Sequence, residues 1–446
     1  MNHSKIGFVS LGCPKNLVDT EVMLKRLDNA GYEIVGDETQ ADAIVINTCA
    51  FIQSAKEEAI ESILDVAWLK KNRSLRGIVV CGCLAQRYAD EIVKELPEVD
   101  AVVGVGSLGN IVDAVAYVLS GRRDAEGALV DVAPPESLAL GGERVVTTPS
   151  YTAYLKIAEG CDNRCSYCAI PGIRGSFRSR PMEDVLREAD ELFSLGAREL
   201  CLVAQDTTNY GADLYGKPSL ARLLGELCKI DFKWIRLLYC YPERIDEELA
   251  DVIAVNSSKV IYLDMPVQHI SDPVLAAMNR RGGGDAVRRA LALLRERAPG
   301  LTVRTTVMAG FPGERGEDFT ALLDFLREAR FDRLGAFAYS DEEGTPAASL
   351  PGKIRADRAG KRRDAIMELA MEQCAERNGA TVGQTVEVLC EGWDGAAGVH
   401  YGRSCADAPD IDGKVYFTAP RRIPAGEFVR VSVTEAMEYD LVGKTV

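Results

Sequence analysis

The most constraining feature of the sequence is the alternation of strand and helix patterns over its first 120 residues. Four short apolar runs fit strands buried on both faces, and longer stretches with helical periodicity separate them. The runs are Ile6–Leu11, Ala43–Ile46, Ile78–Val80 and Ala101–Val103. Strands and helices that alternate in this way form a parallel sheet with helices on its faces. We therefore predict an N-terminal α/β domain over residues 1–120.

A second β/α series begins after a segment rich in glycine, proline and charge. Residues 121–150 break the alternation, and we interpret them as a linker. Beyond them six apolar runs alternate with helical segments, which predicts a partial (β/α)6 barrel over residues 151–378. The runs are Ala153–Ile157, Glu199–Val203, Trp234–Tyr239, Val260–Asp264, Thr302–Met308 and Leu334–Tyr339.

The last stretch, residues 384–446, contains short alternating strands between glycine turns, which predicts a small antiparallel β-barrel. This stretch carries ten acidic and six basic residues, a net charge of −4, and the whole chain has a net charge of −15. An acidic surface disfavours nucleic-acid coats and anionic membranes and suits a basic partner. The predicted fold class is thus multidomain α/β with a terminal β-barrel.

The cysteine content indicates a reducing compartment. The chain has 13 cysteines, an odd number in a long sequence, which favours free thiols or metal ligands over disulfides. The least polar stretch, residues 101–120, contains Asn110, Asp113 and several glycines, so it predicts no membrane span. Residues Met1–Leu11 lack the pattern of a signal peptide. We expect a cytoplasmic protein without a membrane partner.

Three cysteines are spaced for an iron–sulfur cluster. Cys161, Cys165 and Cys168 form a C-x3-C-x2-C motif just after the first predicted barrel strand. Three thiolates can bind three irons of a 4Fe–4S cluster and leave the fourth iron open for a reactant. Structural zinc takes four ligands, and no fourth cysteine or histidine lies nearby. A zinc loop or three core cysteines are the alternatives.

A second set of three cysteines is distributed over the N-terminal domain. Cys13, Cys49 and Cys83 each follow a predicted strand, and the carboxyl ends of parallel strands face one crevice. The three thiols can therefore converge, again with one iron left open. The alternative is that they are small buried apolar residues. Cys81 competes with Cys83 as a ligand, but it lies inside the strand and we expect it in the core.

The segment CDNRCSYCAIP at 161–171, with Tyr167 just before Cys168, resembles the radical S-adenosylmethionine (SAM) superfamily. The resemblance implies that the open iron chelates SAM and that an electron from the cluster cleaves it. It also implies that strand ends of the barrel contact SAM. The candidate contacts are Tyr167, Gln205, Asp206, Gly310 and Glu314. Ordinary turn chemistry is the alternative for the last four.

The order of the three predicted domains resembles the methylthiotransferases over essentially the whole chain. Leu84-Ala85-Gln86-Arg87, directly after Cys83, is a familiar continuation in that family and favours Cys83 over Cys81. The resemblance implies that Cys13, Cys49 and Cys83 bind an auxiliary 4Fe–4S cluster that carries the transferred sulfur. It also implies that the chain uses two 4Fe–4S clusters and SAM, and that the terminal barrel is a TRAM domain. Beyond the barrel cysteines, Arg174, Arg178 and Arg180 are candidate partners for a carboxylate of SAM or of the substrate, and a solvated loop is the alternative.

Four segments resemble the RimO-type branch, which methylthiolates the β-carbon of an aspartate in ribosomal protein uS12. They are GCPKNLVDTE at 12–21, TCAFIQSAKEEAIESIL at 48–64, QDTTNYG at 205–211 and YSDEEGTPA at 339–347. The tRNA-adenosine branch (MiaB-like) usually has Gln-Met after the first cysteine, where this chain has Pro14-Lys15. A noncatalytic iron–sulfur scaffold is the other alternative.

Charge favours a protein substrate. A surface that binds phosphates would be basic, whereas the terminal barrel is acidic and suits a basic small-subunit ribosomal protein. We expect this barrel to be the docking face and tRNA not to be a partner. An electron donor, unidentified from the sequence, is also required. Because all six motif cysteines lie upstream, we expect removal of residues 384–446 to leave both clusters in place.

Overall fold

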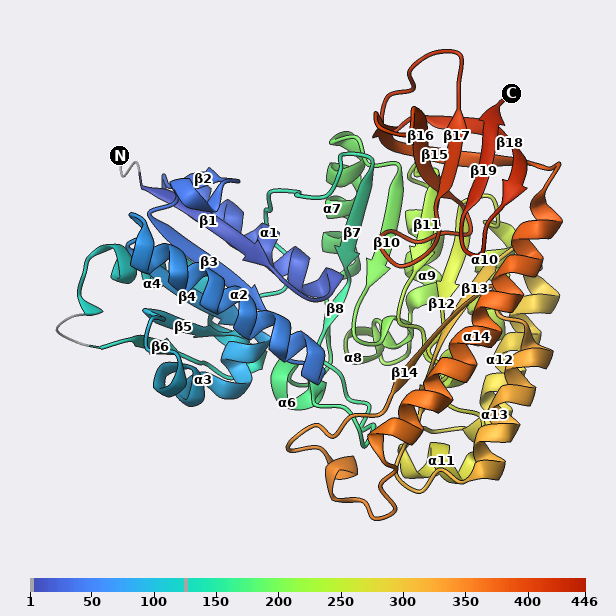
Figure 1. Ribbon diagram of the computed structural model, residues 1–446, viewed down its shortest axis with the longest axis horizontal. Helices are drawn as coiled ribbons and strands as arrows, with labels where there is room; N and C mark the ends of the chain where they lie inside the picture. The colour runs from blue at the N-terminus through green and yellow to red at the C-terminus, as the bar shows by residue number, and fades with distance from the viewer. Residues whose placement is uncertain (1–3, 124–126) are drawn as a thin grey trace.

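The computed structural model describes residues 4–123 and 127–446, which form three packed units (Figure 1). The first unit is a six-stranded sheet in the order β2-β1-β3-β4-β5-β6, and every neighbouring pair is parallel. Its strands are β1 (Lys5–Ser10), β2 (Glu33–Val35), β3 (Ala43–Thr48), β4 (Gly77–Gly82), β5 (Ala101–Gly104) and β6 (Leu129–Asp131). Its helices are α1 (Pro14–Asn29), α2 (Gln53–Asn72), α3 (Cys83–Glu95) and α4 (Ile111–Leu119), with the 3-10 turn η2 (Val105–Asn110) between β5 and α4.

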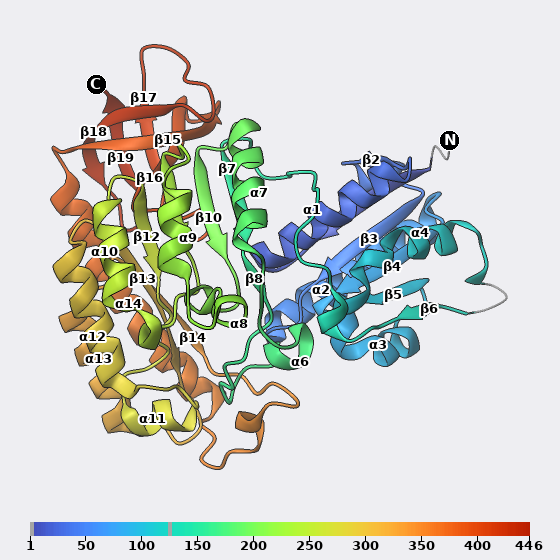
Figure 2. The same cartoon turned by 180° about the vertical axis from the view of Figure 1, so that it is seen from behind.

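The four predicted strands of this unit are present, and the sheet contains two further strands, β2 and β6, that the sequence pattern does not predict. β2 and β6 are only three residues long and lie at the two edges of the sheet, where burial imposes little apolar pattern. β6 falls within residues 121–150, so this segment differs from the predicted linker by completing the N-terminal sheet. α2 and α4 cover opposite faces of this sheet: α2 lies in front of it in Figure 1, and α4 lies in front of it in the opposite view of Figure 2.

The second unit is an open six-stranded parallel sheet in the order β14-β13-β12-β11-β10-β7, which confirms the partial barrel. Its strands are β7 (Thr152–Lys156), β10 (Glu199–Val203), β11 (Trp234–Leu237), β12 (Val260–Asp264), β13 (Thr302–Ala309) and β14 (Arg333–Ala338). A separate two-stranded ribbon pairs β8 (Ala158–Glu159) with β9 (Arg178–Ser179). Each of the six predicted strands lies within two residues of the observed one, because five are buried apolar runs and the sixth, β14, packs its apolar residues against the same core.

Helices cover the outer face of this sheet, as Figure 2 shows for α7, α9 and α10. The helices are α6 (Ile170–Arg174), α7 (Met182–Ser194), α8 (Ala212–Tyr215), α9 (Leu220–Leu227), α10 (Glu247–Val255), α11 (Asp272–Ala277), α12 (Gly283–Arg297), α13 (Gly316–Ala329) and α14 (Ala356–Thr381). The last of these packs along β14 and reaches the terminal barrel. In the described part of the chain, no helix combines the length and apolarity needed to cross a membrane.

The third unit is a closed five-stranded barrel in the order β15-β16-β17-β19-β18. Its strands are β15 (Thr385–Asp394), β16 (Val399–Ser404), β17 (Val415–Thr418), β18 (Phe428–Ala436) and β19 (Leu441–Thr445). The barrel is predicted as antiparallel, and it contains one parallel pairing, between β17 and β19. This pairing closes the barrel without leaving an exposed edge strand.

A buried carboxylate fastens this terminal barrel to the central sheet. Glu199, at the start of β10, is fully buried and accepts hydrogen bonds from Arg236 Nε at 2.6 Å and from both terminal nitrogens of Arg403 at 2.9 and 2.6 Å. Burial alone would raise the pKa of Glu199, but Arg236 and Arg403 lower it to about 2. Arg403 belongs to β16, so the terminal barrel supplies a counter-ion to the core of the central domain.

The terminal barrel cannot be deleted without affecting the central domain, because the two share buried contacts. Its β16–β17 loop enters the open end of the central sheet, where Tyr262 donates a hydrogen bond of 2.7 Å to Asp412 and Asp407 pairs with Arg333. Removing residues 384–446 would strip these partners from groups buried in the central domain. The expectation that the deletion leaves both clusters in place therefore does not fit the structure.

We predict that Arg403→Met lowers the free energy of unfolding by about 3 kcal/mol, because it leaves the buried Glu199 with half of its counter-ions. Urea unfolding followed by the fluorescence of Trp234, whose ring packs 4.8 Å from that of Phe428 in the terminal barrel, measures the change. Arg421→Met is the matched control, since Arg421 forms only an exposed ion pair and should shift stability by less than about 1 kcal/mol. Equal effects of the two variants would contradict the structural role of Arg403.

Candidate functional site

The N-terminal cysteines lie at the carboxyl ends of three adjacent strands. Cys13 is the residue before α1, Cys49 follows β3, and Cys83 opens α3 directly after β4. Since β1, β3 and β4 are neighbours and parallel, their ends meet at one edge of the sheet. Burial is the main cause of the raised pKa of Cys83, and the nearby Cys49 and Cys13 raise it further.

Glycine makes this convergence possible. Gly12 has φ +89°, and a Cβ built on it would lie 2.7 Å from Cys49 Cβ. A side chain there would push the two cysteine loops apart. Cys81, by contrast, is fully buried inside β4 and its Sγ lies 3.9 Å from Met23 Sδ, on the core side of the sheet.

The barrel cysteines occupy the loop between β8 and α6. Cys161 and Cys165 are buried and Cys168 is half-buried. Asn163 Nδ2 donates to Cys161 Sγ at 3.5 Å, and the Tyr241 hydroxyl lies 3.9 Å from Cys165 Sγ. Burial raises the pKa of Cys161 to about 11. Such a thiol becomes a thiolate when a metal ion binds it, so metal binding there releases a proton.

Each set of three thiols fits a cluster whose irons take one thiolate each. Within residues 4–123 and 127–446, no three histidine, cysteine or carboxylate side chains come together as ligands of a single metal ion. A 4Fe–4S cluster has no such need, because its three protein ligands bind three different irons. The chemistry of the donors, three thiols with nearby hydrogen-bond donors to sulfur, suits such a cluster at both sites.

A buried ion network lies between the N-terminal domain and the segments of the barrel that flank the barrel cysteines. Arg174, in α6 beyond the barrel cysteines, donates to Asp19 at 2.6 Å, to Glu159 at 3.2 Å and to Cys83 Sγ at 3.2 Å. Lys156 pairs with the same two carboxylates. Burial alone would raise the pKa of Glu159, but Lys156 and Arg174 hold it below its usual range. Glu159 is therefore ionised, and the network joins two basic side chains, Lys156 and Arg174, to two acidic ones.

Lys15 adds a second contact between the domains. Its Nζ lies 3.2 Å from the centroid of the Tyr239 ring, which belongs to the loop after β11; Lys15 is buried and Tyr239 is half-buried. An ammonium over an aromatic face is favourable, and more so when water is excluded. Lys15 therefore ties the loop of the first cysteine to the barrel.

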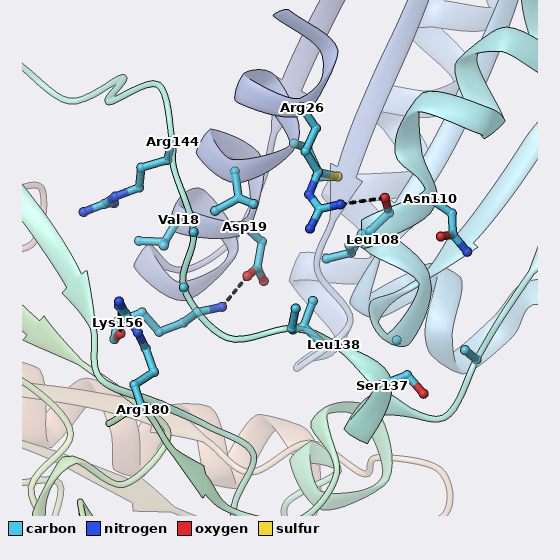
Figure 3. Close-up of a pocket in the computed structure, with 18 of the residues that line it drawn as sticks. Val18, Asp19, Arg26, Leu108, Asn110, Ser137, Leu138, Arg144, Lys156 and Arg180 are labelled. Carbon is cyan, nitrogen blue, oxygen red and sulfur yellow. Dashed lines mark hydrogen bonds and ion pairs between the residues drawn. The ribbon is translucent and has the colours of Figure 1, made fainter. Parts of the chain in front are cut away.

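A cavity lies behind this network, between α1, the segment before β7 and the turn after β5 (Figure 3). It encloses about 260 Å³, and Figure 3 shows Asp19 and Lys156 paired at its wall, with Arg144 and Arg180 beside them. Arg144 and Arg180 both pair with Glu188, so their charges are balanced by the protein. The described lining contains no cysteine, so the cavity is separate from both thiol sets.

The candidate SAM contacts differ in how fully the protein satisfies them. Asp206 accepts hydrogen bonds from Asn163 and Arg244, each at 2.7 Å, and caps the following turn. Glu314 accepts from two backbone N–H groups and from Arg362 at 2.6 Å. These contacts give both carboxylates a role in holding the loops. Gly310 has φ +79° and approaches α14 too closely for a side chain.

Tyr167 and Gln205 retain more freedom. The ring of Tyr167 packs edge-on against Phe311 with centroids 6.5 Å apart. Gln205 donates through Nε2 to Glu159, and its Oε1 is buried without a hydrogen-bond partner among the described residues. A buried amide oxygen left unpaired is costly, so this atom suits a donor group of a bound molecule.

A loop after the last barrel strand closes onto the N-terminal domain. Glu342 is buried, and its carboxylate pairs with Lys56 of α2 at 3.0 Å and with Arg87 of α3 at 3.1 Å. Arg87 also donates to the carbonyl oxygen of Ala50, the residue after Cys49. The sequence points to this segment only as a family-like motif. Its physical role depends on two cations that are more than 250 residues away in the sequence.

Comparisons with known proteins agree with the arrangement of the three units. Residues 5–104 match a family described as "Uncharacterized protein family UPF0004", residues 155–326 match the radical SAM superfamily, and residues 382–446 match the TRAM domain. The chain is 50% identical over 448 residues to the ribosomal protein uS12 methylthiotransferase RimO of Pelotomaculum thermopropionicum, covering 99% of both chains.

The chain belongs to the RimO family of radical SAM methylthiotransferases. The proteins of the same name from Clostridioides difficile and Geobacter sulfurreducens are each 47% identical to it, and each match covers at least 98% of both chains. The resemblance drawn from the cysteine motifs and the four branch segments is thereby confirmed, as is the fold class.

Solved structures support the fold at lower identity. The radical SAM methyltransferase TsrM from Kitasatospora setae, solved with cobalamin and a [4Fe–4S] cluster, matches with a TM-score of 0.59 at 16% identity and covers 78% of this chain and 77% of that one. The cobalamin-dependent radical enzyme OxsB matches with a TM-score of 0.52 at 14% identity and covers 82% of this chain and 55% of that one. Both matches support the fold over about four fifths of this chain.

We predict that Glu342→Ala in this RimO-family chain loosens the contact between the two domains. Lys56 and Arg87 would lose their shared partner, and amide hydrogen exchange at the first turn of α2 should accelerate by about tenfold or more. Glu343→Ala is the matched control, because the neighbouring Glu343 side chain is exposed and only its main-chain oxygen contacts Arg87. Unchanged exchange in Glu342→Ala, or equal acceleration in both variants, would show that Glu342 does not hold the domains together.

Proposed function

We propose that this chain transfers a methylthio group to the β-carbon of an aspartate in ribosomal protein uS12, as the names of its close relatives indicate. The observation that carries the proposal is the bridge from Arg174, in the helix that follows the barrel cysteines, to Cys83 and Asp19 of the N-terminal domain. A reaction that uses both sets needs them to face one water-poor space, because a reactive carbon centre has to meet the sulfur before it meets solvent.

The six cysteines would divide into two sites. Cys161, Cys165 and Cys168 would hold the cluster that binds SAM, and Cys13, Cys49 and Cys83 would hold an auxiliary 4Fe–4S cluster. Bound there, the clusters would supply the electron for reductive cleavage of SAM and the place where the transferred sulfur is kept.

The chain's own residues orient this space and keep it dry. Arg174 holds the sulfur of Cys83 with a charge-assisted hydrogen bond, and its charge offsets the negative charge that a bound thiolate brings. Lys15 and Tyr239 close one side of the crevice, and Glu342 closes another. The unpaired Oε1 of Gln205 would accept a hydrogen bond from a donor group of SAM, and Tyr167 would contact the bound cofactor. Asp206, Gly310 and Glu314 would shape the loops around the cofactor.

The partners follow from the substrate. A basic small-subunit ribosomal protein in the cytoplasm would be bound by the acidic enzyme, and a separate electron donor would reduce the barrel cluster. The negative charge of the chain disfavours tRNA as a competing substrate.

The decisive experiment presents the anaerobically reconstituted enzyme with purified uS12 and with tRNA in parallel reactions. We predict a methylthio adduct on an aspartate of uS12, detected by peptide mass spectrometry, together with release of 5′-deoxyadenosine from SAM. Methylthiolation of tRNA with unmodified uS12 would overturn the proposal in favour of a tRNA enzyme. SAM that stays intact under reducing conditions would indicate a noncatalytic protein.

The division into two cluster sites is tested by iron content. Replacing Cys161, Cys165 and Cys168 by alanine should leave about half of the iron bound after reconstitution, because the N-terminal site holds its own four irons. Replacing Cys13, Cys49 and Cys83 should also leave about half, and this variant should still release 5′-deoxyadenosine but form no methylthio product. Loss of all iron in either variant, or normal product from the second, would contradict two independent sites with these roles.

A further inference from the structure

Helix α2 carries an exposed apolar row that the fold does not use. Ile60, Leu64 and Trp68 are 40%, 50% and 57% exposed, and their spacing of four residues places them on one side of the helix. The opposite side is ordinary core, since α2 packs on β3 and β4 through buried residues such as Ile63. Contiguous apolar patches of this kind mark interaction sites.

A row of carboxylates runs beside the apolar row. Glu57, Glu61 and Asp65 are exposed and follow the same spacing of four residues, offset by three positions. None of the three forms an ion pair with a residue in the described ranges, 4–123 and 127–446. Like charges four residues apart destabilise a helix slightly. Two unfavourable features, uncovered apolar groups and uncompensated charges, therefore coincide on one helix face.

The patch leads directly to the candidate site. Phe51 and Ile52, which are 37% and 38% exposed, lie between Cys49 and the first turn of α2. From Gln53 to Trp68 the helix extends about 22 Å, a length that suits a protein surface and exceeds a small molecule. Figure 1 shows the first turn of α2 beside the central barrel and its far end on the outside of the N-terminal domain.

We propose that this α2 face, formed by Ile60, Leu64 and Trp68 with Glu57, Glu61 and Asp65, docks the basic ribosomal protein substrate. Apolar side chains of the partner would cover the first row, and its lysines or arginines would pair with the second. The inference rests on the proposed function for the identity of the partner. It places the docking face on the domain that holds Cys49, and not on the terminal barrel, which net charge and the likeness to a TRAM domain favour.

Position favours α2 over the terminal barrel. The terminal barrel attaches through Glu199, at the starting end of β10, whereas the barrel cysteines follow the carboxyl end of β8. Figure 1 shows the terminal barrel at one end of the central strands, and α6 and the loop after β14 at the other end. A partner held on α2 needs no path across the barrel to bring a side chain to the crevice.

The test measures binding directly, so that it does not depend on turnover. The dissociation constant of purified uS12 is measured for the reconstituted enzyme and for the double variant Leu64→Ser/Trp68→Ser, with 5′-deoxyadenosine release in the absence of uS12 as a check on the site. We expect the variant to bind uS12 about tenfold or more weakly, because a central tryptophan often dominates an interface. SAM cleavage should be unchanged.

The matched control is Leu195→Ser/Val255→Ser, which removes two apolar side chains that are 67% and 84% exposed on helices of the central domain. It should bind uS12 normally. A second variant, Glu61→Lys/Asp65→Lys, should also bind more weakly and should lose part of the salt dependence of the wild type.

Each outcome decides the inference. Equal affinity of uS12 for wild type, Leu64→Ser/Trp68→Ser and Glu61→Lys/Asp65→Lys would overturn it, and so would wild-type enzyme that does not bind uS12. Sedimentation that shows a dimer lost only in Leu64→Ser/Trp68→Ser, with uS12 affinity unchanged, would assign the face to a second copy of the chain and also overturn it. Binding of uS12 through α2 without methylthiolation would support the docking face and count against the proposed function.

Discussion

The buried network of Asp19, Lys156, Glu159 and Arg174 is the interaction on which the rest of the site depends. Taken singly, each of these charges would be expensive to bury, and only the geometry of the whole set compensates the lost hydration. The compensation requires α1 of the N-terminal domain and β7, β8 and α6 of the barrel to stand in one fixed arrangement. Burying these charges costs free energy of folding, but it permits only one arrangement of the two domains and so of the two thiol sets.

The same logic explains why the segment GCPKNLVDTE carries so much information. α1 turns an unusually polar face inward, and Lys15, Asn16, Asp19 and Glu21 are all buried. Asn16 accepts from Arg174 at 2.9 Å, and Glu21 accepts from Arg144 at 2.5 Å. A helix that packed only on its own sheet would have apolar residues at these positions. The polar residues of this motif are therefore explained by the interface between the two domains.

The sequence predicted the strands of both parallel sheets because burial on two faces leaves continuous apolar runs, as at Ala43–Ile46. It placed Cys13, Cys49 and Cys83 at the carboxyl ends of strands, as observed, while the role of the six motif cysteines as cluster ligands stays a prediction. It did not find the contacts of Arg174, Glu342 or Arg403, because each joins residues far apart in the chain and has no local period. It also did not predict edge strands such as β6, because three residues at a sheet edge carry too little apolar pattern.

A second core shows how the three domains act as one body. Val18 of α1, Tyr154 and Trp234 of the central sheet, and Leu389 and Ala408 of the terminal unit pack together inside the open barrel. A partial barrel leaves its interior strands uncovered, and here the neighbouring domains supply the missing apolar surface. Rigid domains then leave the exposed surface as the place where substrate recognition can vary. An apolar and acidic face on α2, next to Cys49 and outside this shared core, can bind a partner without disturbing the geometry of the site.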